Sequence, residues 1–168
     1  MSKRIVVVGG KDHGKTTLIE AICKVCGTPV RKLGISMEAH LNIDGEEYIF
    51  FDYPETEDYQ ENLKSFDGIV LCVSATDGPM GGARQQMFHC EEIGMSMIVL
   101  FINKTDLVDD RDTLDLVTME SQEFIDEHGV FSDDCPVIHG SASLAWEEPK
   151  GEWAWSVLKL VNTVAEVF

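Results

Sequence analysis

The chain has 168 residues and carries 13 Lys and Arg against 30 Asp and Glu, which gives a formal net charge of −17. Such a charge opposes binding to a phosphate backbone or to an anionic membrane, so neither a DNA or RNA groove binder nor a membrane-docking protein is expected. Hydrophobic residues make up 44% of the chain, too many for a disordered acidic protein, and the length suits a single domain over residues 1–168.

The sequence carries no signal for export or for membrane insertion. No apolar run approaches the roughly 20 residues that a membrane helix needs. The first residues, Met-Ser-Lys-Arg, lead directly into an apolar run without a leader-like region. Five cysteines, an odd number, fit a reducing compartment. The sequence therefore predicts a cytoplasmic protein, whose acidity fits both an ordinary acidic bacterial protein and one from a salt-adapted organism.

Strand and helix patterns alternate along almost the whole chain. Residues 5–8 predict a buried strand, and helical spacing over residues 15–26 follows and is closed by Gly27. Residues 38–43 and 47–52 flank an Asp44-Gly45 turn and predict a hairpin. Then follow a buried strand at 68–74, a helix around 87–93, a strand at 97–102, a helix around 114–128, a short strand at 136–139 and a helix around 157–168. This order predicts an α/β fold: a mostly parallel sheet of about six strands, helices on both faces and one antiparallel edge hairpin.

The clearest motif lies between the first strand and the first helix. Residues 9–16 read Gly-Gly-Lys-Asp-His-Gly-Lys-Thr and match the phosphate-loop pattern G-x-x-x-x-G-K-[ST]. Its glycines let backbone N–H groups surround phosphates, and the helix adds its positive N-terminal end. Lys15 would reach the β and γ phosphates, the Thr16 hydroxyl would bind Mg²⁺, and His13 would order the loop. The predicted phosphate-binding residues are Gly9, Lys11, Asp12, His13, Gly14, Lys15, Thr16 and Thr17.

A second motif follows the strand at 97–102 and reads Asn103-Lys104-Thr105-Asp106. The Asp106 carboxylate can accept hydrogen bonds from N1–H and the exocyclic amine of guanine, a donor pair that adenine lacks, so it would select GTP over ATP. The Asn103 amide would join this loop to the phosphate loop, and the Lys104 stem would lie along the base. Further along, the predicted guanine contacts are backbone N–H groups in the small-residue loop at Ser141, Ala142 and Ser143.

Taken together, residues 12–18, 75–80, 103–110 and 140–142 resemble the nucleotide-binding domain of the elongation factor Tu family of translational GTPases. The resemblance implies a Ras-like P-loop fold and Mg²⁺-dependent binding of GTP and GDP, with hydrolysis of GTP. It also implies that Asp52 holds Mg²⁺ through a water. Ser36 in Gly34-Ile35-Ser36, which resembles the family's Gly-Ile-Thr, would complete the metal shell.

The chain departs from this family where hydrolysis is controlled. The family's switch II reads Asp-x-Pro-Gly-His, whereas here Glu55 replaces the glycine and Thr56 the histidine that orients water. Thr56 is the remaining catalytic candidate, and a threonine hydroxyl is a poor general acid–base group. Both switch segments are also shorter than the family's. Two hypotheses follow: a GTPase with weak intrinsic hydrolysis, and a non-catalytic pseudo-GTPase that binds nucleotide and presents a surface to a partner.

The remaining features leave the partner open. The family's two β-barrel domains have no counterpart in this chain, so tRNA delivery by the chain alone is not expected, and a protein partner or regulator is. A G domain excised from a longer protein is a further interpretation, which the altered switches oppose. Lys11 would either supply a fixed cation near the γ-phosphate or point to solvent. Cys23 and Cys26 form a C-x-x-C without a second pair, which favours core packing over a metal site. Three tryptophans, Trp146, Trp153 and Trp155, would pack in the core or form an exposed partner patch.

Overall fold

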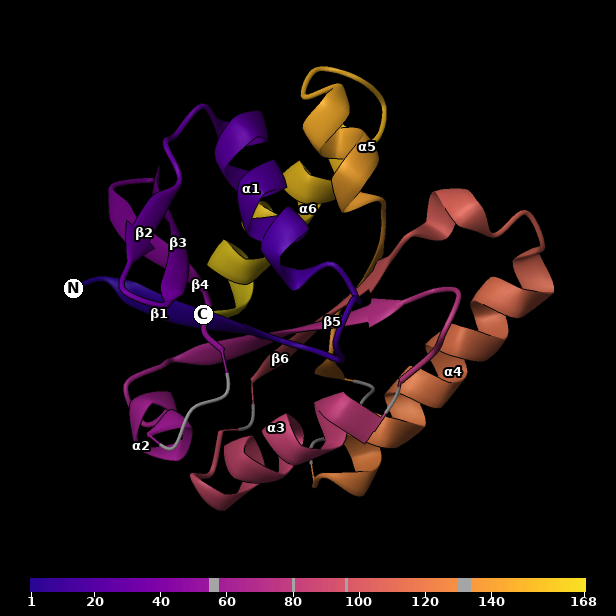
Figure 1. The fold of residues 1–168 in the computed structure, drawn as a ribbon, viewed down its shortest axis with the longest axis horizontal. Helices are drawn as coiled ribbons and strands as arrows, with labels where there is room; N and C mark the ends of the chain where they lie inside the picture. Colours follow the sequence, from indigo (N-terminus) through magenta and orange to yellow (C-terminus); the bar gives the residue numbers. More distant parts are fainter. Residues whose placement is uncertain (55–57, 80, 96, 130–133) are drawn as a thin grey trace.

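A computed structural model of the chain describes residues 1–54, 58–79, 81–95, 97–129 and 134–168. Within these residues the strands form one seven-stranded sheet in the order β2-β3-β4-β1-β5-β6-β7 (Figure 1). The strands are β1 Lys3–Val8, β2 Arg31–Leu33, β3 Ser36–Ile43, β4 Glu46–Asp52, β5 Gly68–Ser74, β6 Ile98–Asn103 and β7 Val137–His139. β1 runs parallel to β4 and β5, and β6 runs parallel to β5 and β7, whereas β2–β3 and β3–β4 are antiparallel. The predicted architecture is confirmed, with β2 as an additional strand.

Helices cover both faces of the sheet (Figure 1). One layer holds α1 Lys15–Cys26, α5 Ala142–Glu147 and α6 Ala154–Val167. The opposite layer holds α2 Tyr59–Leu63, α3 Gly81–Glu92 and α4 Arg111–Glu127. Successive residues of β1 alternate between the two layers: Ile5 and Val7 pack with the first, Val6 and Val8 with the second. This two-sided burial explains why the central strands are continuous apolar runs.

Local turn chemistry sets the hairpin and the end of the first helix. Asp44 and Gly45 both have left-handed backbone, with φ of 52° and 90°, as the two-residue turn between β3 and β4 requires. Gly27 ends α1 with φ of 72°. In the part of the chain that the structure describes, every helix is too short or too polar to cross a bilayer.

The sheet topology determines where the functional loops meet. Because β1, β4, β5, β6 and β7 are parallel, their carboxyl ends lie along the same edge of the sheet. Ligands in open α/β sheets bind outside these carboxyl ends. The loops that follow β1, β4, β6 and β7 carry the two sequence motifs and the small-residue segment, so the fold brings them to one edge.

Candidate nucleotide site

The loop between β1 and α1 borders a pocket of about 330 Å³. Five predicted phosphate-binding residues, one predicted base-binding residue and Gly10 line it: Gly10, Asp12, Gly14, Lys15, Thr16, Thr17 and Lys104. Asp12 and Gly14 have left-handed backbone, with φ of 62° and 95°. A loop in which left-handed residues alternate with others turns successive backbone N–H groups toward one point, which forms a concave site for anions. The pocket therefore has the form and the backbone chemistry of a phosphate site.

His13 anchors this loop to the sheet beneath it. Its side chain is 3% exposed, and its Nδ1 accepts a hydrogen bond of 3.3 Å from the backbone N–H of Ser74. The carbonyl oxygen of His13 accepts from Cys72 Sγ at 3.4 Å and from Asn103 Nδ2 at 2.9 Å. Burial lowers the pKa of His13, which favours the neutral ring that this acceptor role requires. His13 thus orders the loop, as the sequence predicts.

Two glycines of the loop have no room for a side chain. A Cβ at Gly9 would lie 2.3 Å from the carbonyl oxygen of Cys72, and a Cβ at Gly14 would lie 2.3 Å from Asn103 Nδ2. Gly14 also needs its left-handed backbone, which L side chains rarely adopt. Gly9 and Gly14 are thus required because the loop backbone comes close to β5 at the first and to β6 at the second.

In the segment predicted to bind the base, Asp106 has a carboxylate oxygen that is unpaired within the part of the chain that the structure describes. Asp106 belongs to the short helix Thr105–Leu107, and its Oδ1 is buried without a hydrogen-bond partner among the described residues. Nearby, the Asn103 amide joins three segments, because Nδ2 donates to His13 and Oδ1 accepts from the backbone N–H of Ala142 at 2.9 Å. The structure thus contains the link between the base loop and the phosphate loop that the sequence predicts, while guanine binding by Asn103 stays a prediction.

The small-residue loop is ordered by similar bonds. Ser141 caps α5, its hydroxyl accepting from the backbone N–H of Leu144 at 3.3 Å. Since the N–H of Ala142 already donates to Asn103, this group is not a free donor for a base. Ser143 follows in the first turn of α5. The structure places this turn beside Asn103, while base contacts by residues 141–143 stay a prediction.

The chain matches a protein-family model over most of its length. The model described as "Elongation factor Tu GTP binding domain" matches residues 30–168, well over half of the chain. The chain belongs to the elongation factor Tu GTP binding domain family. The match includes the base-side motif and Asp52, and it begins after the phosphate loop. Family membership confirms a GTP-binding G domain with a Ras-like P-loop fold.

Two of the three metal-binding candidates meet in this G domain. Thr16, in the first turn of α1, donates through Oγ1 to Asp52 Oδ2 at the carboxyl end of β4, at 2.5 Å. A hydroxyl and a carboxylate are hard oxygen donors of the kind that Mg²⁺ prefers, usually alongside waters and substrate phosphates. The pair fits such an ion. The described residues contain no group of three or more His, Cys, Asp or Glu placed to hold a metal.

Ser36, the third metal candidate, lies elsewhere in the G domain. Its hydroxyl donates to the Leu33 carbonyl at 3.0 Å and contacts Glu38 Oε1 at 3.4 Å. Met37, the next residue, is the register partner of Asp52. Because neighbouring residues of a strand point to opposite faces, Ser36 lies on the face away from Asp52. The structure does not bring Ser36 to the metal pair, and a metal role would require the β2–β3 hairpin to change.

Three lysines near the phosphate loop differ in their contacts with it. Lys15 Nζ donates to the Gly9 carbonyl at 2.9 Å, and Lys104 Nζ donates to the Asp12 carbonyl at 2.5 Å. Lys11 is exposed, which leaves both interpretations of this residue open. The two switch II replacements, Glu55 and Thr56, lie outside the described residues.

One residue of the site carries no motif and was not predicted. Gln86 in α3 is 5% exposed, and its Oε1 accepts from the backbone N–H of Gly9 at 2.9 Å. The two residues are 77 positions apart. Only the unusual burial of a glutamine would have signalled the contact, and burial of a single helix position is not readable from one sequence.

The remaining candidates from the sequence are two cysteines and three tryptophans, and none of them lines the nucleotide pocket. Burial raises the pKa of both Cys23 and Cys26, so both are held as thiols, and both pack with the core as predicted. Trp153 packs against the core. The core-packing interpretation is wrong for Trp146, which is 44% exposed beneath Lys24, and for Trp155, which is 73% exposed.

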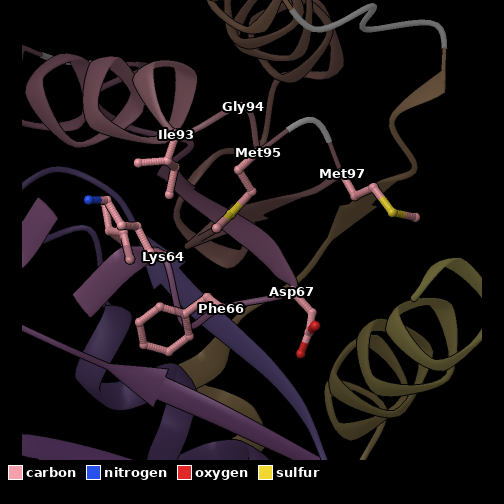
Figure 2. A pocket seen from close by; sticks show the side chains of 8 residues that line it. Lys64, Phe66, Asp67, Ile93, Gly94, Met95 and Met97 are labelled. Carbon is pink, nitrogen blue, oxygen red and sulfur yellow. The ribbon is translucent and has the colours of Figure 1, made fainter. Parts of the chain in front are cut away.

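Figure 2 shows a second pocket, at the opposite edge of the sheet from the nucleotide site. It measures about 380 Å³ and sits at the amino ends of β5 and β6, between the residues after α2 and those after α3. Its lining is Leu63, Lys64, Phe66, Asp67, Ile93, Gly94, Met95 and Met97. Since the phosphate loop lies at the carboxyl ends of the strands, this pocket is not a part of the nucleotide site.

Proposed function

We propose that this G domain binds GTP and GDP together with Mg²⁺ and hydrolyses GTP slowly. The observation that carries the proposal is the buried Asp106 Oδ1, which lacks a donor among the described residues. An unpaired buried acceptor costs about 1–3 kcal/mol, so a ligand that donates to it is strongly favoured. Guanine presents N1–H and its amine side by side, whereas adenine does not, which supports selection of guanine.

The phosphates would occupy the pocket along the loop before α1. Lys15 would leave the Gly9 carbonyl to pair with the β and γ phosphates, and the amino end of α1 would add its dipole. Thr16 and Asp52 would hold Mg²⁺, the first directly and the second through a water. When bound, this ion neutralises charge on the β and γ phosphates.

Hydrolysis is expected to be slow because the usual water-positioning group is replaced. Loss of a positioned general acid or base costs about 10²–10⁴ in rate. Thr56 is the candidate to orient water, with a hydroxyl in place of an imidazole, and Glu55 would place a negative charge near the γ-phosphate. The same two replacements favour the second candidate, a binding module that holds nucleotide without turnover.

The net charge of the chain supports our proposal for its partner and its location in the cell. With a net charge of −17, the G domain is expected to meet a protein partner or regulator in the cytoplasm rather than DNA or a membrane. Delivery of tRNA by this chain alone is not proposed, since an acidic surface repels the tRNA backbone.

The test is a titration of nucleotide-free protein with fluorescent GDP and GTP analogues in Mg²⁺, with unlabelled ATP as competitor. Tight binding of both analogues, unaffected by ATP, would support the proposal, and phosphate release would then separate a slow GTPase from a binding module. Binding of GDP without GTP would indicate that Glu55 closes the γ-phosphate position. Binding of neither would refute the proposal.

A further inference from the structure

We propose that Gln86 is a positioning residue that fixes the start of the phosphate loop from α3 and so sets how long a nucleotide stays bound. The inference rests on the proposed function, because it concerns the lifetime of GDP in the same site. It assigns a role to a residue outside every motif of the sequence.

The contact joins two distant parts of the chain. Gln86 Oε1 accepts from the backbone N–H of Gly9, the first residue after β1, at 2.9 Å. Gln86 lies on the face of α3 that also buries Ala83, Met87 and Cys90, each 1% exposed. These apolar neighbours hold α3 against the sheet.

Burial of a glutamine at this position needs a reason. An amide loses hydrogen bonds with water when it is buried, and a methionine of similar length would fill the space without this loss. Buried polar groups are therefore nearly always paired. Here the partner is a backbone N–H that would otherwise be left without an acceptor at the turn out of β1.

Gly9 is held from more than one side. Its α-carbon approaches β5 so closely that a Cβ would lie 2.3 Å from the Cys72 carbonyl. Its own carbonyl accepts from Lys15 Nζ at 2.9 Å. The residue is thus bound by Gln86 through its N–H and by Lys15, a predicted phosphate ligand, through its carbonyl. Release of the N–H would loosen the segment from which the loop curves around the phosphates.

The helix that carries Gln86 also has a neighbouring helix, α2, on the same face of the sheet. α3 packs against α2, and the rings of Tyr59 and His89 are 6.2 Å apart. α2 follows the segment that holds Glu55 and Thr56. α3 is therefore joined both to α2 and, through Gln86, to Gly9 of the phosphate loop.

The test compares Gln86→Met with Gln85→Met on the exposed side of the same helix. Dissociation of a fluorescent GDP analogue is followed in stopped flow after addition of excess GDP. Loss of one hydrogen bond predicts that Gln86→Met releases the analogue about tenfold faster, while Gln85→Met matches the wild type. In ¹⁵N-labelled protein, the Gly9 amide resonance should shift in Gln86→Met and not in Gln85→Met.

A third variant separates positioning from general loosening of the helix. Cys90→Ala leaves a cavity under α3 and lowers the melting temperature without touching the loop. Its release rate should equal that of the wild type. Equal acceleration in Cys90→Ala and Gln86→Met would overturn the inference, as would an unchanged release rate in Gln86→Met. If Gln86→Met does not fold, Gln86→Asn, which keeps the amide but is too short to reach Gly9, gives the same comparison. Failure of the wild type to bind the analogue would instead refute the proposed function.

Discussion

The role of Asp106 can be tested by changing its charge and hydrogen-bonding pattern while keeping its shape. In Asp106→Asn one acceptor oxygen becomes an NH₂ donor. Guanine presents two donors at this position, so the variant would lose one hydrogen bond and would place two donors face to face. Asp109 is exposed and lies three positions further along the chain. Asp109→Asn therefore makes the same change of charge outside the pocket and serves as the matched control.

The expected loss follows from the burial of Oδ1. A hydrogen bond to a charged group contributes about 1.5–3 kcal/mol, and the opposed donors add to the loss, which suggests about 3 kcal/mol in total. At 1.4 kcal/mol for each factor of ten, GDP affinity should fall on the order of 100-fold. Xanthine carries a carbonyl where guanine carries its amine, so the variant should bind xanthosine diphosphate better than GDP.

Competition against a fluorescent GDP analogue measures both nucleotides in the wild type and in the two variants. Asp109→Asn should bind GDP like the wild type. If Asp106→Asn keeps wild-type affinity for GDP and gains none for xanthosine diphosphate, the buried oxygen does not meet the base, and the assignment of the guanine site is wrong.

Three further predictions concern the phosphate side. Thr16→Val removes a hydroxyl ligand, so its GDP affinity in Mg²⁺ should approach its affinity in EDTA, whereas the wild type should bind more tightly with the ion. Burial lowers the pKa of His13 below 6.5, so the unfolded chain takes up the proton first as the pH falls. The stability that this neutral ring contributes is present above pH 6.5 and is lost below it, and unfolding in urea should show a steeper loss in the wild type than in His13→Asn. Gly14→Ala forces a Cβ to within 2.3 Å of Asn103 Nδ2 at a φ of 95°, so calorimetry should show a lower melting temperature, and an unchanged one would contradict the close contact.

Patterning along the chain was sufficient to predict the central architecture. Continuous apolar runs mark β1, β5 and β6 because both faces of these strands are covered. The Asp44-Gly45 pair marks the hairpin because both residues adopt left-handed backbone. Such features depend on a few neighbouring residues, so one sequence is enough to find them.

Short elements without a hydrophobic pattern were not predicted. β2 consists of three exposed residues, and it forms because Arg31 and Leu33 pair with β3 across a turn at Gly34. The short helix α5 follows small residues that suggested only a loop, and it begins where Ser141 caps it. Neither segment has an apolar period of its own, so its structure is decided by pairing and capping.

The candidate site likewise has features that the sequence predicted and features that it did not. The motifs identified the phosphate loop and residues 103–106 because their chemistry requires fixed residue types at fixed spacing. The unpaired Asp106 oxygen, the Gln86 contact and the distance of Ser36 from Asp52 depend on three-dimensional packing. In the function that we propose these features bear on specificity and control, and they became visible only in the folded chain.

The side-chain amide of Asn103 has a consequence for the order in which the protein acquires its structure during synthesis. It binds His13, 90 positions earlier, and Ala142, 39 positions later. A ribosome releases these three segments one after another, and the first of them waits until most of the chain has emerged. The phosphate loop is therefore translated early but gains its full set of supports late, so the growing chain should become able to retain a nucleotide only after β7 and the turn behind it have been made.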